Sequence, residues 1–288
     1  MGKIATKTKR ISRSIAGDLF VWIMLILLGA FSALPFVFSI IQSIKPLNEL
    51  FVFPPRFFVV DPTFNNFFSL KQLTGSMWVP LSRYLFNSVF VSVAGTVLHV
   101  FIASMAAYPL AKYRFPFSKT LFNVVVISLL FTYEVTFLPL FVEMSKIGLI
   151  DNMLALILPA LSAPLGLFLM KQFMETIPDS ILEAATVDGA STFKTYRSVV
   201  MPQVKPAVLT LVIFSFNSLW NRQGLEFIYS EQLKTFPSVL MQITASGGIA
   251  RAGVAAAAAV ILMLPPILIF LFSQSFIIET MAHSGIKE

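Results

Sequence analysis

The chain has 288 residues, of which 57% are hydrophobic and only 12% are charged, and its net charge is +7. Soluble domains contain about 25% charged residues, so this composition excludes an ordinary soluble protein and indicates one whose surroundings are membrane lipid. The sequence has no cysteine, which excludes disulfides and thiolate metal sites. No basic run is long enough to follow a nucleic-acid backbone, so no nucleic-acid partner is expected.

Six stretches are apolar enough to form membrane-spanning helices, because about 20 apolar residues cross the ~30 Å hydrocarbon layer of a bilayer. In chain order these stretches lie at about 19–44, 85–110, 121–142, 152–170, 207–219 and 253–277. The first is longer than the core of a signal peptide and is interpreted as an uncleaved anchor. The sequence therefore predicts an all-α membrane protein with six transmembrane helices in one domain, 19–277.

Lysine and arginine predict the orientation, because positively charged loops tend to stay in the cytoplasm. The segments expected there, with both termini, are the tail 1–18, the loop after the second stretch, 171–205 and the tail 278–288. The segments of mixed charge, expected outside, are 45–84, 143–151 and 221–251. Prolines break 45–84 repeatedly, so this segment is expected to form an ordered external cap rather than a single helix.

The cytoplasmic segment between the fourth and fifth stretches has clear local signals. Ser180 and Glu183 have the spacing of a capping box, in which a hydroxyl and a carboxylate bond the first free backbone N–H groups. Ala184 and Ala185 favour a helix, and Gly189 is expected to end it in a left-handed conformation. The result is a helix of about two turns.

A second helix is expected over about 191–200, with Pro202 marking its end. Helices this short are not stable alone in water, so the first helix needs a surface to pack against. Its apolar side chains could fold back on the bundle or dock into a cytoplasmic partner. The residues alone leave both alternatives open.

The same segment carries a resemblance to a known family. Glu183-Ala-Ala-x-x-x-Gly189, followed after nine residues by Val199-x-Met-Pro202, resembles the EAA loop of ABC importer permeases. Further stretches resemble maltose-type carbohydrate permeases: 43–50, 53–55, 61–66, 106–116, 148–151, 220–221 and 285–287. The sequence departs from that family's usual pattern after Asn221, where Arg222-Gln-Gly224 follows.

The resemblance implies a type I ABC importer permease bundle in the bacterial cytoplasmic (inner) membrane, with a cytoplasmic coupling helix. It implies as partners a second related permease chain, two ATPase subunits and an extracytoplasmic solute-binding protein. This chain would bind no cofactor, since it has no phosphate-binding loop, and ATP and magnesium would be held by the ATPase subunits. The coupling residues implied by the resemblance are Glu183, Ala184, Ala185, Asp188, Gly189, Ala190 and Pro202.

Polar residues near the ends of two apolar stretches are candidates for the transport path. Tyr133 and Glu134 lie in the outer half of the third stretch, where an ionisable group usually faces a cavity or a partner. A neighbouring helix or the water boundary could equally satisfy this carboxylate. A second group lies at the end of the fifth stretch and consists of Asn217, Trp220, Asn221 and Arg222. Its aromatic ring and amides suit sugars, although Trp is also common at the membrane interface.

Two other features are interpreted as packing. His99 lies in an apolar run and is expected to be buried and hydrogen-bonded, and the alanines of 255–259 allow close approach between helices. The leading hypothesis is a permease subunit of an importer for carbohydrate, with oligosaccharide as the expected substrate. The alternatives are an importer permease for a non-sugar solute and a self-contained secondary transporter or channel.

Overall fold

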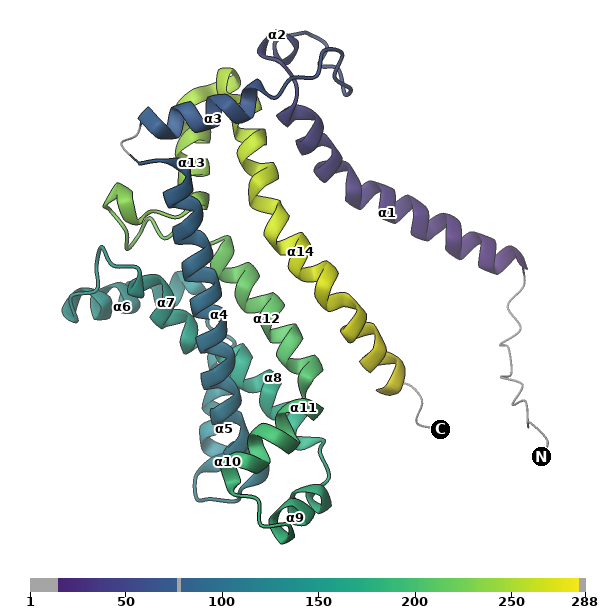
Figure 1. Ribbon diagram of the computed structural model, residues 1–288, viewed down its shortest axis with the longest axis vertical. Helices are drawn as coiled ribbons and strands as arrows, with labels where there is room; N and C mark the ends of the chain where they lie inside the picture. Colours follow the sequence, from purple (N-terminus) through teal and green to yellow (C-terminus); the bar gives the residue numbers. More distant parts are fainter. Residues whose placement is uncertain (1–14, 77–78, 285–288) are drawn as a thin grey trace.

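The computed structural model describes residues 15–76 and 79–284, and all regular structure in them is helical (Figure 1). Within these residues four helical segments are long and apolar enough to cross a membrane, and the number reaches six if two bent helix pairs each form one span. The four are α1 (Ile15–Ser43), α4 (Leu81–Lys112), α7 (Leu154–Leu161) with α8 (Pro164–Glu175), and α14 (Ala252–Ser284). The predicted all-α membrane class is confirmed.

The third predicted span is not straight, and a second bend lies just before the fifth. α5 (Ser118–Ser128) and α6 (Tyr133–Lys146) meet at 109°, so the prediction of one continuous helix over 121–142 is wrong. α12 (Lys205–Trp220) meets the helical segment before it at 79° and, at 16 residues, spans only about 24 Å. Hydropathy measures how apolar a stretch is but does not detect a turn inside it, which is why the bends were not predicted.

α4 is the central helix of the bundle. It contributes to three buried apolar clusters. One is shared with α8 and α12, one with α3 (Asn65–Ser76), α13 (Phe236–Gly247) and α14, and one with the α6–α7 region. The residues that α4 places in them are Tyr84, Val91, Ala103, Ala107 and Tyr108. α7, α8, α12 and α13 therefore pack directly on α4.

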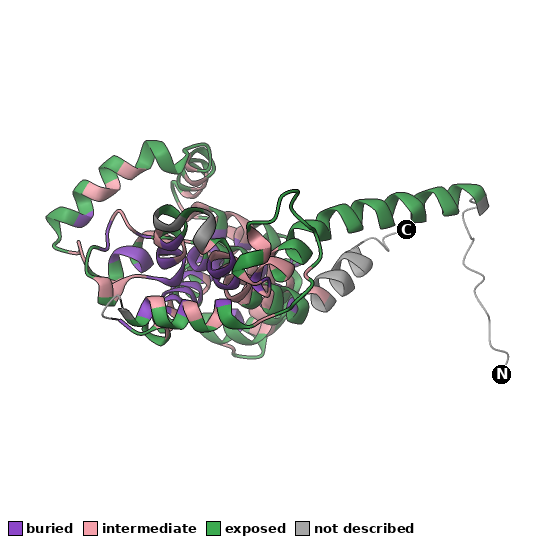
Figure 2. Cartoon of the chain, turned by 90° about the horizontal axis from the view of Figure 1, so that it is seen from above, coloured by how far each residue is buried: buried purple, intermediate pink, exposed green. Residues whose placement is uncertain are grey.

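α1 packs on α14 and leans away from the other helices (Figure 1). None of the residues in its most apolar 18-residue window is buried, and Figure 2 shows it exposed along nearly all of its length. A helix satisfies its own backbone hydrogen bonds, so it is stable in lipid without covering neighbours.

The predicted cap is folded onto the end of α1 and contains α2 (Leu47–Leu50) and α3 (Asn65–Ser76). Lys45 is buried, and its ammonium donates to the carbonyl of Arg56 at 2.6 Å. The Asn66 amide donates to the carbonyls of Ser43 and Lys45, both at 2.8 Å. These bonds order the segment without a long helix.

The two ends of the molecule carry different elements. α2 and α3 lie at one end, with α13 (Phe236–Gly247) beside them, as Figure 1 shows. The opposite end carries α9 (Asp179–Val187), α10 (Thr192–Thr195), a π-turn over Tyr196–Val200 and α11 (Met201–Gln203). Segments expected on opposite sides of the membrane therefore lie at opposite ends of the molecule. The predicted cytoplasmic tails lie partly outside the described residues, at 1–14 and 285–288.

Candidate coupling segment and transport cavity

α9 begins two residues earlier than the sequence predicted. Its N-cap is Pro178, whose extended backbone leads into the helix, and no side chain caps the first turn. Ser180 lies inside that turn, so the predicted capping box of Ser180 and Glu183 is wrong. Asp179 instead places a carboxylate at the positive end of the helix dipole, and a hydrogen bond from Lys112 lowers the pKa of this carboxyl.

The end of α9 explains the Ala-x-x-x-Gly-Ala part of the sequence pattern. Gly189 has φ of +75°, the left-handed conformation that glycine adopts without strain. The Ala190 N–H bonds the carbonyl of Ala185, and the Gly189 N–H bonds that of Thr186, both at 3.0 Å. This pair of bonds is a Schellman motif, so the predicted stop at Gly189 is confirmed.

α9 presents most of its surface to the outside. Glu183, Ala184 and Asp188 are exposed, and Val187 is 87% exposed although it is apolar. Behind the helix, Glu183 and Ala190 line a cavity of about 670 Å³. Its other walls come from the end of α4 and from α10.

Pro202 does not end the second helix where the sequence predicted. The helical segment runs to Gln203, with a π-turn over Tyr196–Val200. Proline has no N–H to donate, and the Met201 N–H bonds the carbonyl of Tyr196, five residues earlier. The wider turn lets the helix continue through Pro202 before it bends into α12.

The broken helices line a cavity of about 620 Å³ beside α12. Irregular backbone within a membrane is tolerated where it lines a cavity, and Leu129 and Phe131, at the bend between α5 and α6, lie in its wall. Its polar lining consists of His99, Ser128, Tyr133, Thr136, Ser162, Ser215, Ser218 and Arg222. Such hydroxyl groups can donate to and accept from a polyhydroxylated ligand.

Two of the predicted path residues meet in this wall. The Tyr133 hydroxyl donates to Glu226 at 2.8 Å, and the Arg222 guanidinium lies 3.7 Å from the same carboxylate. Arg222 also lies 5.9 Å from the centre of the Tyr133 ring and 5.6 Å from that of Phe227. Glu226 was missed in the sequence, although an acid four residues after an arginine is a usable signal.

Of the alternatives left open for Glu134, the structure agrees with a carboxylate near the water boundary and not with a buried one. It lies exposed in the first turn of α6, directly after the bend, and is not part of the cavity lining. The break in the helix is the reason, because it turns this carboxylate toward the outside. Of the adjacent pair, only Tyr133 faces the cavity.

The amides near the end of α12 and its tryptophan have different surroundings. Asn217 and Asn221 line a second cavity of about 480 Å³ between α12 and α14, and the Asn221 amide donates to the Asn217 carbonyl oxygen at 2.9 Å. Trp220 is buried, stacks on Phe216 and donates from its indole to the carbonyl of Leu262 at 2.7 Å. Trp220 therefore has no free face for a sugar in this conformation.

His99 and the alanine run pack as predicted. The His99 ring bonds the Ser215 hydroxyl at 2.6 Å and the Ala163 carbonyl at 3.2 Å. Ala257 and Ala258 are fully buried in α14. Both features hold helices together, although the edge of His99 also reaches the cavity wall.

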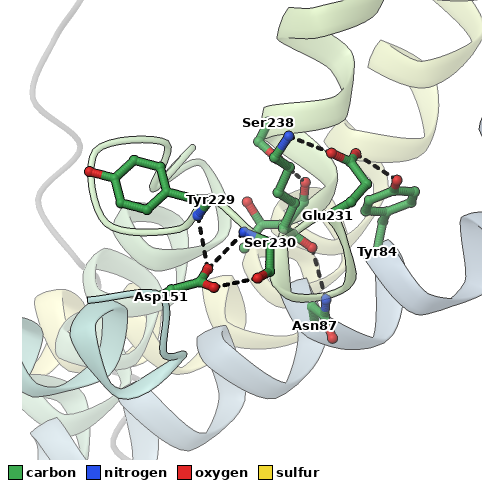
Figure 3. Close-up of polar contacts among 9 residues, drawn as sticks. Tyr84, Asn87, Asp151, Tyr229, Ser230, Glu231 and Ser238 are labelled. Atoms are coloured by element: carbon green, nitrogen blue, oxygen red, sulfur yellow. Dashed lines mark hydrogen bonds and ion pairs between the residues drawn. The ribbon is translucent and has the colours of Figure 1, made fainter. Parts of the chain in front are cut away.

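A polar network ties together segments that are expected outside the membrane (Figure 3). The Asp151 carboxylate accepts the backbone N–H of Tyr229 at 2.9 Å and that of Ser230 at 2.7 Å, and it also accepts the Ser230 hydroxyl. The Ser230 hydroxyl and backbone bonds lower the pKa of Asp151. The short sequence 148–151 was noted for its resemblance, but no role was predicted for this carboxylate.

Comparisons with known proteins agree with this arrangement. Residues 99–283 match the family described as binding-protein-dependent transport system inner membrane component. The arabinooligosaccharides transport system permease protein AraQ of Bacillus subtilis (strain 168) is 31% identical over 258 residues, covering 88% of this chain and 90% of AraQ. The sn-glycerol-3-phosphate transport system permease protein UgpE of Pectobacterium atrosepticum is 28% identical over 213 residues, covering 73% and 76%.

A solved structure has a similar fold. It is a bacterial ABC transporter involved in the import of the acidic polysaccharide alginate, with a TM-score of 0.78 at 21% identity, covering 92% of this chain and 99% of that one. The family match spans more than half of the chain and describes a permease component rather than an ATPase. The chain therefore belongs to the binding-protein-dependent transport system inner membrane components, the multi-pass permease subunits of ABC importers.

Proposed function

We propose that this chain is a permease subunit of an importer for carbohydrate, with oligosaccharides as the substrate class. The supporting observation is the cavity beside α12, whose polar lining is mainly hydroxyl groups with one imidazole and one guanidinium. These groups match the alternating donors and acceptors of a sugar. AraQ, a relative of similar length, is named for arabinooligosaccharides.

The proposed complex contains a second related permease, two ATPase subunits and an extracytoplasmic solute-binding protein, in the bacterial cytoplasmic membrane. This chain forms half of the path, with Tyr133, Arg222, Asn217 and Asn221 as path residues. Glu134 and Trp220 are left out of the path, because one is turned outward and the other is fully packed. ATP binding moves the ATPase subunits, and the bundle changes between inward-open and outward-open states.

The proposed contact with the ATPase is α9 and the segment that ends in Pro202. An exposed two-turn helix with an exposed apolar side chain, Val187, needs a partner surface to be stable. The motif residues divide into two roles. Ala185, Gly189 and Ala190 build the end of the helix, whereas Glu183, Ala184 and Asp188 are exposed for contact.

Replacing Glu183 tests this proposal in the reconstituted importer with its binding protein. Glu183→Lys is expected to abolish ATP-driven oligosaccharide uptake, because it reverses an exposed charge in the proposed contact, while insertion into the membrane stays normal. Glu175→Lys is the matched control, since it reverses another exposed carboxylate, at the end of α8 and outside α9. Normal uptake by Glu183→Lys would contradict the coupling role.

The same assay tests the substrate class. Uptake of peptides, amino acids or sn-glycerol-3-phosphate in place of oligosaccharides would favour a permease for a non-sugar solute. UgpE, a relative named for the last of these, makes that comparison necessary. Binding of candidate oligosaccharides to the cognate solute-binding protein gives an independent measurement.

A further inference from the structure

α4 joins the two ends of the molecule. Its 32 residues extend over about 48 Å, and its side chains enter three separate buried clusters. Close-packed interiors transmit displacement with little compression. A movement at one end of α4 is therefore carried to the other end unless the helix breaks.

The inner end of α4 is tied to the start of α9 by Lys112. This side chain is only 6% exposed, and its ammonium donates to the carbonyl of Ile177 at 2.5 Å and to the Asp179 carboxylate at 2.8 Å. These two acceptors flank Pro178, the N-cap of α9. A buried ammonium that loses its partners is strongly unfavourable, so the bonds fix α9 to α4.

The outer end of α4 is tied in a similar way to residues 231–236 of the external segment 229–236 (Figure 3). The Tyr84 hydroxyl donates to Glu231 at 2.8 Å, and the Asn87 amide donates to the carbonyls of Gln232 and Lys234, both at 2.9 Å. One helical turn after Tyr84, the Ser88 hydroxyl accepts a hydrogen bond from the backbone N–H of Phe236 at 2.8 Å. Four polar contacts thus attach this segment to α4.

From these contacts we infer that Lys112 is a positioning residue that makes α9 and α4 move as one body, and that α4 carries this movement to the external segment 229–236. The inference rests on the proposed function in one respect, that α9 receives the movement of an ATPase subunit. The external segment follows Arg222 and Glu226 in the cavity wall and is held by Asp151. The linkage would therefore connect the coupling contact to the outer mouth of the path.

The first test measures how much ATP is hydrolysed per oligosaccharide taken up by the reconstituted importer. Lys112→Met is expected to raise this ratio by about tenfold, because a charge-assisted hydrogen bond of ordinary strength corresponds to that factor. Loss of folded complex alone would lower uptake and hydrolysis together and leave the ratio unchanged. An unchanged ratio would overturn the inference.

Two further variants sharpen this measurement. Lys112→Arg is expected to restore much of the native ratio, since a guanidinium can donate to both acceptors. Lys119→Met removes the same charge from the first turn of α5, across the short loop from Lys112, and is expected to behave as the native chain. A raised ratio in Lys119→Met would show that charge, not the contact of Lys112, is responsible, and would also overturn the inference.

The second test measures movement directly and does not depend on transport. The chain has no cysteine, so Ser180→Cys in α9 and Tyr229→Cys in the external segment can be spin-labelled selectively in the full complex. Both positions are exposed. The distance between the labels is expected to stay constant with and without ATP, and to change or broaden when Lys112→Met is added.

The two proposals fail in different ways. A label distance that changes with ATP in the chain with native Lys112 would overturn the rigid linkage, even if Glu183→Lys abolishes uptake. Normal uptake by Glu183→Lys, with a constant label distance, would contradict the ATPase contact at α9 while leaving the attachment of α9 to α4 supported.

Discussion

Asp151 shows how one side chain can organise an external loop. It has a left-handed φ of +61°, which places its carboxylate beside Tyr229 and Ser230, and its own N–H bonds the carbonyl of Phe227 at 2.7 Å. Aspartate and asparagine tolerate this backbone conformation better than most residues. The loop between α6 and α7 is thereby joined to the segment beyond α12.

The lowered pKa of Asp151 predicts a pH dependence. The folded pKa lies below the ordinary 3.8, so the stabilisation is fully present above about pH 4 and is lost as the pH falls through the folded pKa. Asp151→Asn is expected to lose this stabilisation at neutral pH. The rate of amide hydrogen exchange at Tyr229 and Ser230 should then rise about fivefold to tenfold. Exchange rates corrected for intrinsic pH effects measure this, and protection equal to that of the native chain would contradict it.

At the scale of elements, the structure follows the sequence where the determinants are local. The end of α9 was predictable, because Gly189 and the residues around it contain the whole Schellman motif. Its start was not, because Pro178 and the distant Lys112 define it in place of the local capping box. Pro202 was misjudged for a related reason, since a π-turn absorbs the missing N–H.

The packing of α8 on α4 leads to a prediction for Gly166. A Cβ atom at this position would lie 2.3 Å from His99 Nε2 and 3.1 Å from the Cβ of Ala103. Gly166→Ala is therefore expected to destabilise the fold by about 1–3 kcal/mol through overpacking. Gly29→Ala in α1 is the control, because a Cβ there meets nothing within 4 Å. Thermal unfolding in detergent measures both, and equal midpoints would show that α4 and α8 separate easily.

At the scale of the whole molecule, hydropathy and charge predicted the class, the approximate spans and the two ends. They did not predict which polar residues meet, because that depends on the bends. The 109° break turned Glu134 outward and brought Tyr133 to Arg222 and Glu226. Trp220 is packed against α14 while Asn217 is exposed, a difference that hydropathy does not encode.

The exposure of α1 bears on whether this chain transports alone. None of the residues in its most apolar window is buried, and the cavity between α12 and α14 is lined on one side by Phe36 of α1. A closed path through lipid needs protein on all sides, since its polar groups must not meet hydrocarbon. The described helices therefore support the proposal that this chain forms half of a path together with a second permease chain.

Liposomes that contain this chain alone are accordingly expected to show no oligosaccharide flux, with or without ATP. Liposomes that contain both permeases, the ATPase subunits and the binding protein are expected to show ATP-dependent uptake. Omitting only the binding protein provides the control, because it keeps the membrane assembly intact while removing delivery of the substrate. Substrate-specific flux through the lone chain would contradict the half-path interpretation and favour a self-contained transporter or channel, since no ATPase would then be needed to change its conformation.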